Sequence, residues 1–264
     1  MLKRLLLAAL LLLSVQAQAL EYTDVYYDVA ESGWGVFLVQ SDTTQFLAFF
    51  IYGPDGKPTW YVAILASDGA GNYTGPLYAT IGTYFASPWQ GNNSALAGTV
   101  TFAPIDRYHA TLTYTVNGVG TVTKTVVRQT LTAYQMSGNY SGSMAGSVSA
   151  CADPAQNDPS FRARYAVSVT QNGDTSASLV FTFVDMAHNG LVCTVSGPLT
   201  HLGRLYQLPG QITCVGGPGG GNPHAATIDG LHPTGQGIEG YLSGTTGGGC
   251  QVSLHFAAVK DVDN

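Results

Sequence analysis

Histidine and carboxylate side chains are the residues of this sequence that could support metal or acid–base chemistry. One aspartate and four histidines fall in predicted loops of its second half: Asp185, His188, His201, His224 and His232. Imidazole and carboxylate groups are ordinary zinc ligands, so these loops could converge on a metal ion. However, no His-Glu-x-x-His motif is present, and that helical spacing is what holds two histidines on one metal. We therefore predict no metal site.

Paired carboxylates are a second possible source of chemistry, because glycoside cleavage uses two Asp or Glu side chains at a defined separation. Asp185 or Asp229 could form such a pair with Glu239, but spacing along the sequence does not give the separation. No Gly-x-Ser-x-Gly motif marks a hydrolase nucleophile. We predict no catalytic residue, and an exported hydrolase using these carboxylates or the loop histidines stays as an alternative.

Aromatic side chains are concentrated in the first half and could bind a ligand by stacking. The candidates are Trp34, Tyr52, Trp60 and Trp89, because such rings stack on sugars and enclose apolar molecules. The alternative is a core position, which we favour for Trp34 and Trp60. Trp89 follows a proline in a polar loop, so it is the better candidate for exposure. The expected ligand is a glycan or an apolar small molecule, and no cofactor is expected.

All four cysteines lie in the second half, and their number and spacing predict disulfides: Cys151, Cys193, Cys214 and Cys250. An even number of cysteines in an exported chain favours disulfides, and no Cys-x-x-Cys pair indicates zinc or redox chemistry. Three pairings are possible. Cys193 and Cys214 lie symmetrically about Gly203-Arg204, a predicted hairpin tip, and directly opposed strand residues are within disulfide reach. This geometry favours Cys193–Cys214 and hence Cys151–Cys250.

The segment 31–63 is expected to position the aromatic residues as three strands joined by two turns. Pro54-Asp55-Gly56 has strong turn chemistry, because Pro presets φ and Gly accepts a positive φ. The runs 36–39 and 46–51 are apolar at successive positions, which predicts that both strand faces are buried. Later in the chain, Asn117-Gly118 is the strongest hairpin signal.

The second half is expected to contain two further hairpins. Residues 164–171 and 178–184 flank a turn at 172–174, and residues 191–199 and 205–215 flank the tip named above. The Ser- and Gly-rich segment 136–146 is expected to be a linker. The predicted fold class is therefore all-β, with two antiparallel barrel- or sandwich-like modules, of which the second is disulfide-bonded. The expected modules are residues 20–135 and 136–264.

Three segments of the first half carry a specific aromatic pattern: Glu31-Ser32-Gly33-Trp34-Gly35, Phe49-Phe50-Ile51-Tyr52, and Asp55-Gly56-Lys57-Pro58-Thr59-Trp60-Tyr61-Val62. In this pattern the chain resembles a family of secreted bacterial proteins that share the signature and to which no biochemical role is assigned. Members often end in a Gly-rich segment with one Cys, as residues 247–250 do. The resemblance implies an exported all-β protein and implies no catalytic residues.

The first nineteen residues have the form of a secretory signal peptide. A basic start, Lys3 and Arg4, precedes the apolar run 5–15 and the small-residue cleavage site 17–19. That run is too short for a transmembrane helix of roughly 20 residues. Loss of Lys3 and Arg4 leaves 8 of the 10 basic side chains against 16 acidic ones, a net charge of −8. Such a charge repels phosphate backbones, so nucleic acid is not expected as a partner.

Together these features predict a secreted or periplasmic protein without a transmembrane segment after signal cleavage. The predicted function is non-catalytic binding or surface interaction, with the hydrolase named above or a structural envelope component as alternatives. The sequence does not predict the ligand's identity or the oligomeric state.

Overall fold

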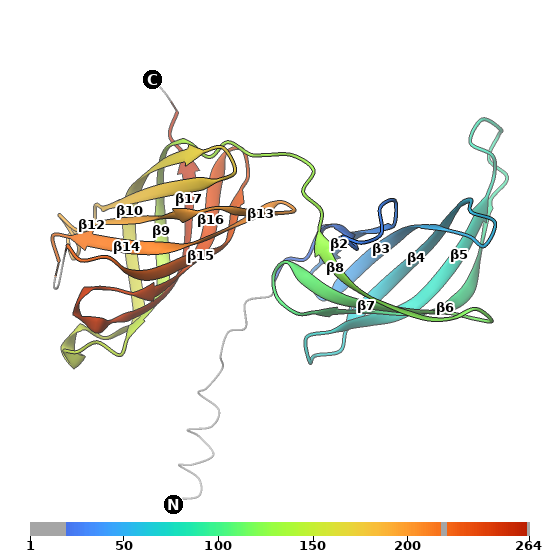
Figure 1. The fold of residues 1–264 in the computed structure, drawn as a ribbon, viewed down its shortest axis with the longest axis horizontal. Helices are drawn as coiled ribbons and strands as arrows, with labels where there is room; N and C mark the ends of the chain where they lie inside the picture. Colours follow the sequence, from blue (N-terminus) through green and yellow to red (C-terminus); the bar gives the residue numbers. More distant parts are fainter. Residues whose placement is uncertain (1–19, 218–220, 263–264) are drawn as a thin grey trace, which may run out of the picture. The chain divides into compact units, whose positions relative to one another are not determined.

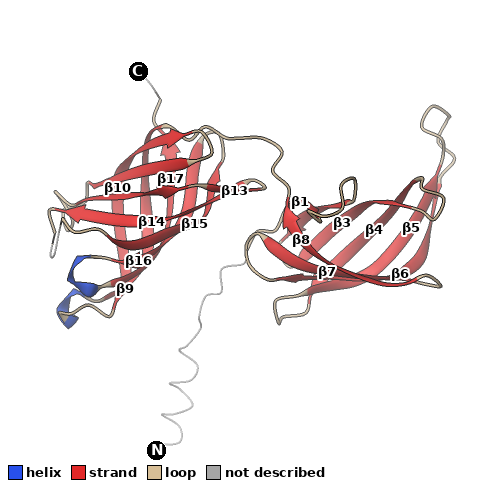
Figure 2. Cartoon of the chain, viewed as in Figure 1, coloured by secondary structure: helices blue, strands red, loops and turns tan. Residues whose placement is uncertain are grey.

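The structure is a computed structural model that describes residues 20–217 and 221–262. The predicted signal peptide, residues 1–19, lies outside the described residues. Nearly all regular structure in the described part is β-strand (Figure 2). Helix is limited there to two short 3₁₀ segments, η1 (Pro154–Gln156) and η2 (Gly247–Gly249). The all-β prediction is confirmed.

The first eight strands form a closed barrel in which each strand neighbours the next one along the chain (Figure 1). They are β1 (Asp24–Tyr27), β2 (Gly35–Ser41), β3 (Thr44–Tyr52), β4 (Pro58–Ser67), β5 (Tyr73–Gly82), β6 (Asn92–Pro104), β7 (His109–Val116) and β8 (Gly120–Arg128). The predicted turn at 54–56 joins β3 to β4, and the one at 117–118 joins β7 to β8. Both hairpin predictions are confirmed.

The inner face of the first barrel is apolar, and alternate residues of each strand fill it. Leu38 of β2, Leu47 and Phe49 of β3 and Leu65 of β4 are fully buried. The residues between them point outward, and Phe50 is 45% exposed. The prediction that both faces of β2 and β3 are buried is therefore wrong, because only one side of a barrel wall faces the interior and the outward residues Phe37, Phe46 and Phe50 are exposed.

The later strands form a second sheet, in the order β12-β11-β10-β9-β17-β16-β15-β14-β13. They are β9 (Gly138–Ser149), β10 (Asp158–Asn172), β11 (Ser176–Phe183), β12 (Val192–Pro198), β13 (Thr200–Leu202), β14 (Leu205–Val215), β15 (His224–Pro233), β16 (Gly237–Thr245) and β17 (Gln251–Lys260). β12 also pairs with β14. This pairing closes a ring of eight strands. β13 is not part of the ring and pairs with the first residues of β14.

The segment predicted as a linker, residues 136–146, instead supplies most of β9, which pairs with β10 and β17. The glycines there have a packing role. A Cβ atom on Gly142 would lie 2.1 Å from the backbone oxygen of Ala257 on β17, so only glycine lets these two strands approach so closely. The linker prediction is wrong because glycine in this segment marks close backbone contact and not flexibility.

Both predicted disulfides are present in the second sheet. Cys193 of β12 lies directly opposite Cys214 of β14, with Cα atoms 4.1 Å apart. Cys151 bonds to Cys250, just before β17, with a Cα–Cα distance of 3.9 Å. The hairpins at 172–174 and around the Gly203 tip are also confirmed. The second barrel is thus cross-linked at two places.

The chain divides into two compact units. Of the described residues, one unit contains 20–23, 36–107 and 111–123, and the other contains 24–35, 108–110 and those from 124 onward. β8 ends at Arg128 and β9 begins at Gly138. The module boundary predicted between 135 and 136 stays a prediction.

Candidate ligand-binding cavity

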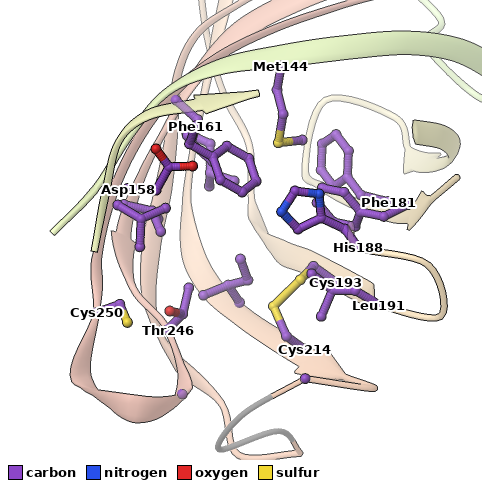
Figure 3. Close-up of a pocket in the computed structure, with 18 of the residues that line it drawn as sticks. Met144, Asp158, Phe161, Phe181, His188, Leu191, Cys193, Cys214, Thr246 and Cys250 are labelled. Carbon is purple, nitrogen blue, oxygen red and sulfur yellow. A yellow bond between two sulfur atoms is a disulfide. The ribbon is translucent and has the colours of Figure 1, made fainter. Parts of the chain in front are cut away.

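A cavity of about 270 Å³ lies inside one end of the second barrel (Figure 3). Seven of the eight ring strands contribute to its wall, all except β15. The wall is mainly apolar, with Met144 of β9, Phe161 of β10, Leu242 of β16 and Val252 of β17 among the lining residues. These side chains occupy the inward-facing positions of their strands, so the barrel wall itself shapes the cavity.

Three aromatic rings packed edge-to-face lie at the wall of the cavity. Phe181 lines it and packs edge-on against Tyr165 and Phe256, with ring centroids 5.0 and 5.4 Å apart. All three rings are buried, and Tyr165 donates its hydroxyl proton to the backbone oxygen of Ala257 at 3.0 Å. The same burial raises the pKa of Tyr165. These side chains fill the barrel interior next to the cavity.

Cysteines of both disulfides line the cavity. Cys193, Cys214 and Cys250 are all wall residues, and Figure 3 shows the Cys193–Cys214 bond at the cavity edge. One bond ties β12 to β14, and the other ties the start of β17 to the chain after β9. Two covalent links therefore hold the cavity end of the barrel in one shape.

His188, in the loop between β11 and β12, is fixed in the wall by Asp185. One carboxylate oxygen of Asp185, Oδ1, lies 2.7 Å from Nδ1 of His188 and accepts the His188 backbone N–H at 3.1 Å. The other, Oδ2, accepts the backbone N–H of Arg164 at 3.1 Å. Burial alone would raise the pKa of Asp185, but the hydrogen bonds from His188 and Arg164 outweigh it, and the pKa is lowered.

The tautomer of His188 follows from this contact. An ionised carboxylate only accepts hydrogen bonds, so Nδ1 of His188 carries a proton and donates it to Asp185. The ring packs between Phe161 and Phe183, with centroids 5.0 and 5.9 Å away. The structure thus places one oriented polar group in an apolar wall.

Asp158, the first residue of β10, supplies a carboxylate to the wall. The inward residues of β10 are otherwise the odd-numbered ones from Phe161 onward, such as Ala163. Between Asp158 and Phe161 the pairing with β9 shifts by one residue: Asp158 faces Val148, whereas Phe161 faces Gly146. This bulge turns Asp158 to the inner side of the barrel.

The other histidines considered as metal ligands do not converge. Nδ1 of His201 lies 3.1 Å from Asp174, and Nδ1 of His232 lies 3.2 Å from Glu239. His188 pairs with Asp185, as described. Within residues 20–217 and 221–262, no group of three or more His, Cys, Asp or Glu side chains could hold a metal ion.

The aromatic candidates of the first half have different environments. Trp34 is buried, and Lys124 Nζ lies 5.1 Å from its ring centroid. Tyr52 and Trp60 are exposed on the outer side of the β3–β4 hairpin, where Trp60 contacts Phe50 at 5.1 Å. The core position is therefore confirmed for Trp34 and wrong for Trp60, which is 56% exposed. Trp89 is 71% exposed, in the loop between β5 and β6.

A buried ion pair that sequence reasoning missed lies within the larger compact unit. Arg128 donates to Asp24 Oδ2 at 3.0 Å, and the backbone N–H of Arg204 donates to the same oxygen at 3.1 Å. Both charged side chains are buried. The available signal was the inward position of Arg128 in the alternating pattern of β8, two residues after the buried Val126.

No profile of a known protein family matches the chain, and no curated protein matches it. Among solved structures, it is similar to a crystal structure of a protein from Bacteroides fragilis NCTC 9343 that is provisionally described as an outer membrane protein. The alignment covers 91% of this chain and 96% of that one, with 14% sequence identity and a TM-score of 0.33. A likeness at this score carries no argument about function. In the part of the chain described above, no helix has the length and apolar character needed to cross a membrane.

Proposed function

We propose that this chain is an exported, non-catalytic binding protein whose ligand occupies the cavity of the second barrel. The observation that carries the proposal is the cavity of about 270 Å³ inside the barrel, lined by Phe181 and by cysteines of both disulfides. Eight strands make a barrel just wide enough either to be filled by side chains or to hold one small ligand. Here side chains such as Phe256 fill part of the interior and leave this cavity in the rest.

The size and lining of the cavity limit the ligand. Small-molecule sites commonly have volumes of about 300–1,000 Å³, so this cavity accommodates one compact molecule, such as a short alkyl chain or a small ring system. Its wall is built from Met, Phe, Leu and Val side chains. Burial of an apolar ligand against such a wall contributes roughly 25 cal/mol per Å² removed from water. An apolar small molecule therefore fits better than a glycan.

Export is supported by chemistry of the chain itself. Two disulfides persist in oxidising compartments and are rare in the cytosol, and both cross-link this barrel. The predicted signal peptide at 1–19 agrees with that location. A secreted and a periplasmic binding protein are equally compatible with these features.

The test is a fluorescence titration of the purified mature protein with N-phenyl-1-naphthylamine, an uncharged apolar probe. We expect a saturable rise in probe emission. The variant Val252→Phe fills the cavity from β17, whereas Val259→Phe places the same ring on the exposed side of the same strand. The first should weaken probe binding at least tenfold, and the second should leave it unchanged.

Circular dichroism and thermal unfolding of both variants establish that they fold. If the folded Val252→Phe protein still binds the probe as the wild type does, the ligand does not occupy this cavity. A wild-type protein that gives no saturable emission with the probe would also contradict the proposal. Both results can be read without knowledge of the natural ligand.

A second candidate site rests on the exposed aromatics of the first barrel. Trp60, Phe50 and Tyr52 lie together on the outer side of the β3–β4 hairpin and carry no charge. Exposed rings of this kind stack on sugar faces. A glycan screen read by tryptophan emission should give a shift that Trp60→Ala abolishes and Trp89→Ala does not. Equal responses from both variants would argue against a site on this hairpin.

A further inference from the structure

We infer that the cavity ligand is a small lipophilic amine, which is bound in its positively charged form. The inference rests on the proposed function, because it requires that the cavity of the second barrel holds a ligand. It adds the chemical class of the head group, which neither the shape nor the apolar wall determines. The argument depends on the charged groups that face the cavity.

The ionisable side chains of the described wall are Asp158 and His188, and no Lys or Arg is among its described residues. The nearby arginines of β10, Arg162 and Arg164, occupy exposed positions that alternate with the inward ones. A ligand in the cavity therefore meets a carboxylate and an imidazole, and no cation balances the carboxylate from within the wall.

Asp158 is available to a ligand. Its Oδ1 accepts the backbone N–H of Ser160 at 2.9 Å, which fixes the orientation of the carboxylate. Its Oδ2 has no hydrogen-bond partner in the described part of the chain. The bulge of β10 turns this side chain inward beside Phe161, and Figure 3 shows the carboxylate next to the Phe161 ring. An ammonium group at this oxygen would form a charge-assisted hydrogen bond.

His188 adds a second acceptor. Its Nδ1 proton is directed to Asp185, so Nε2 is the acceptor nitrogen of the neutral imidazole, and the negative charge of Asp185 lies behind the ring. The other polar side chains of the wall, Gln156 and Thr246, can donate or accept, so Asp158 and the neutral His188 favour a donor on the ligand. An ammonium group has three donors and no acceptor, and it matches these two groups better than a carboxylate or a hydroxyl group does.

The aromatic wall supports the same class. Phe161, Phe181 and Phe183 surround the cavity, and the face of an aromatic ring attracts a cation within about 6 Å of its centroid. A fatty acid would experience the opposite environment, because its carboxylate would lie near Asp158 with Asp185 behind His188. The sign of the wall charge thus selects the head group, and the apolar residues bind the hydrocarbon part.

The test measures displacement of N-phenyl-1-naphthylamine by octylamine, octanol and octanoate, which share one chain length. We expect octylamine to displace the probe at about a tenfold lower concentration than octanol, because the amine adds a charge contact at low effective dielectric. Octanoate should be the weakest of the three. Asp158→Asn should abolish the advantage of octylamine, whereas Asp55→Asn, the same charge change in an exposed turn of the first barrel, should preserve it.

The outcomes separate this inference from the proposed function. If octanoate displaces the probe as well as octylamine does, or better, the amine assignment is overturned and the cavity proposal remains intact. An octylamine preference that survives in folded Asp158→Asn would also overturn it, since overall protein charge would then explain the preference. Absence of probe binding in the wild type would remove the proposed function itself.

Discussion

Removal of the two disulfides one at a time should destabilise the second barrel by unequal and calculable amounts. The double variants are Cys151→Ala with Cys250→Ala, and Cys193→Ala with Cys214→Ala. The cysteines of the first bond are 99 residues apart and those of the second are 21 apart. Loss of loop-closure entropy from the unfolded chain then gives about 4.7 kcal/mol for the long loop and about 3.4 kcal/mol for the short one.

The structure explains why this unfolded-state calculation applies to both bonds. Cys193 and Cys214 sit opposite each other in strands whose backbone ladder continues on either side. The Cys151–Cys250 bond, which closes the long loop, lies next to the Gln251–Ser149 pair of β17 and β9. Neighbouring strands therefore stay paired when either bond is absent, so the folded state changes little. The main effect of each substitution is a larger conformational freedom of the unfolded chain.

Urea unfolding followed by two signals measures the effect. Trp60 and Trp89 lie in the compact unit of residues 36–107, whereas Trp34 lies in the unit that contains the second barrel, so the variants are made in a Trp34→Phe background. Far-ultraviolet circular dichroism reports strands of both barrels. With an m-value of about 2 kcal/mol/M, the midpoint of the dichroism transition of the second barrel should fall by about 2.4 M urea without Cys151–Cys250 and by about 1.7 M urea without Cys193–Cys214. The tryptophan transition should move much less. A larger loss of stability without Cys193–Cys214 than without Cys151–Cys250, or an equal shift of both signals, would refute the reasoning.

Three further perturbations have defined expectations. Asp24→Asn removes the buried carboxylate to which Arg128 donates and should cost about 3–5 kcal/mol in urea unfolding, whereas an effect below 1 kcal/mol would contradict a stabilising role of the pair. The pKa of Asp185 is lowered in the fold, so ionised Asp185 stabilises the folded state above the unfolded pKa of about 3.9, and this stabilisation is lost as pH falls below it. Asp185→Asn should therefore reduce the loss of thermal stability between pH 5 and pH 3. The same loss in the variant as in the wild type would contradict this. Gly142→Ala places a methyl group 2.1 Å from a backbone oxygen and should cost about 1–3 kcal/mol; Gly82→Ala, with no atom nearer than 3.8 Å, should be close to neutral, and equal losses in the two variants would disprove the packing argument.

Local chemistry in the sequence predicted much of the fold. Asn117-Gly118 and Pro54-Asp55-Gly56 define turns by their own φ preferences, and the structure has hairpins at both. The Cys193–Cys214 pairing followed from the symmetry of two strands about one tip, which depends only on the register of a single hairpin. Features that depend on neighbouring residues in the chain were therefore predictable.

Features that depend on which strands meet were not predictable in the same way. Trp60 looks like a core residue in the sequence, yet it lies on the outer side of β4, because the register of a strand decides which of two alternating faces is inward. The segment that became β9 looks like a linker, because glycine signals both flexibility and close packing. Only the distance from Gly142 to Ala257 of β17 distinguishes the two roles.

The cavity is the clearest case of long-range dependence. Its wall combines residues from β9 to β17, separated by more than a hundred positions, and its negative charge depends on one bulge. Asp158 lies three residues before Phe161, so regular alternation without the bulge would turn Asp158 outward while Phe161 stayed inside. The cavity would then be an apolar pocket with one imidazole and no carboxylate. A shift of one residue in a strand therefore separates a site for any small hydrocarbon from one that selects a positively charged head group.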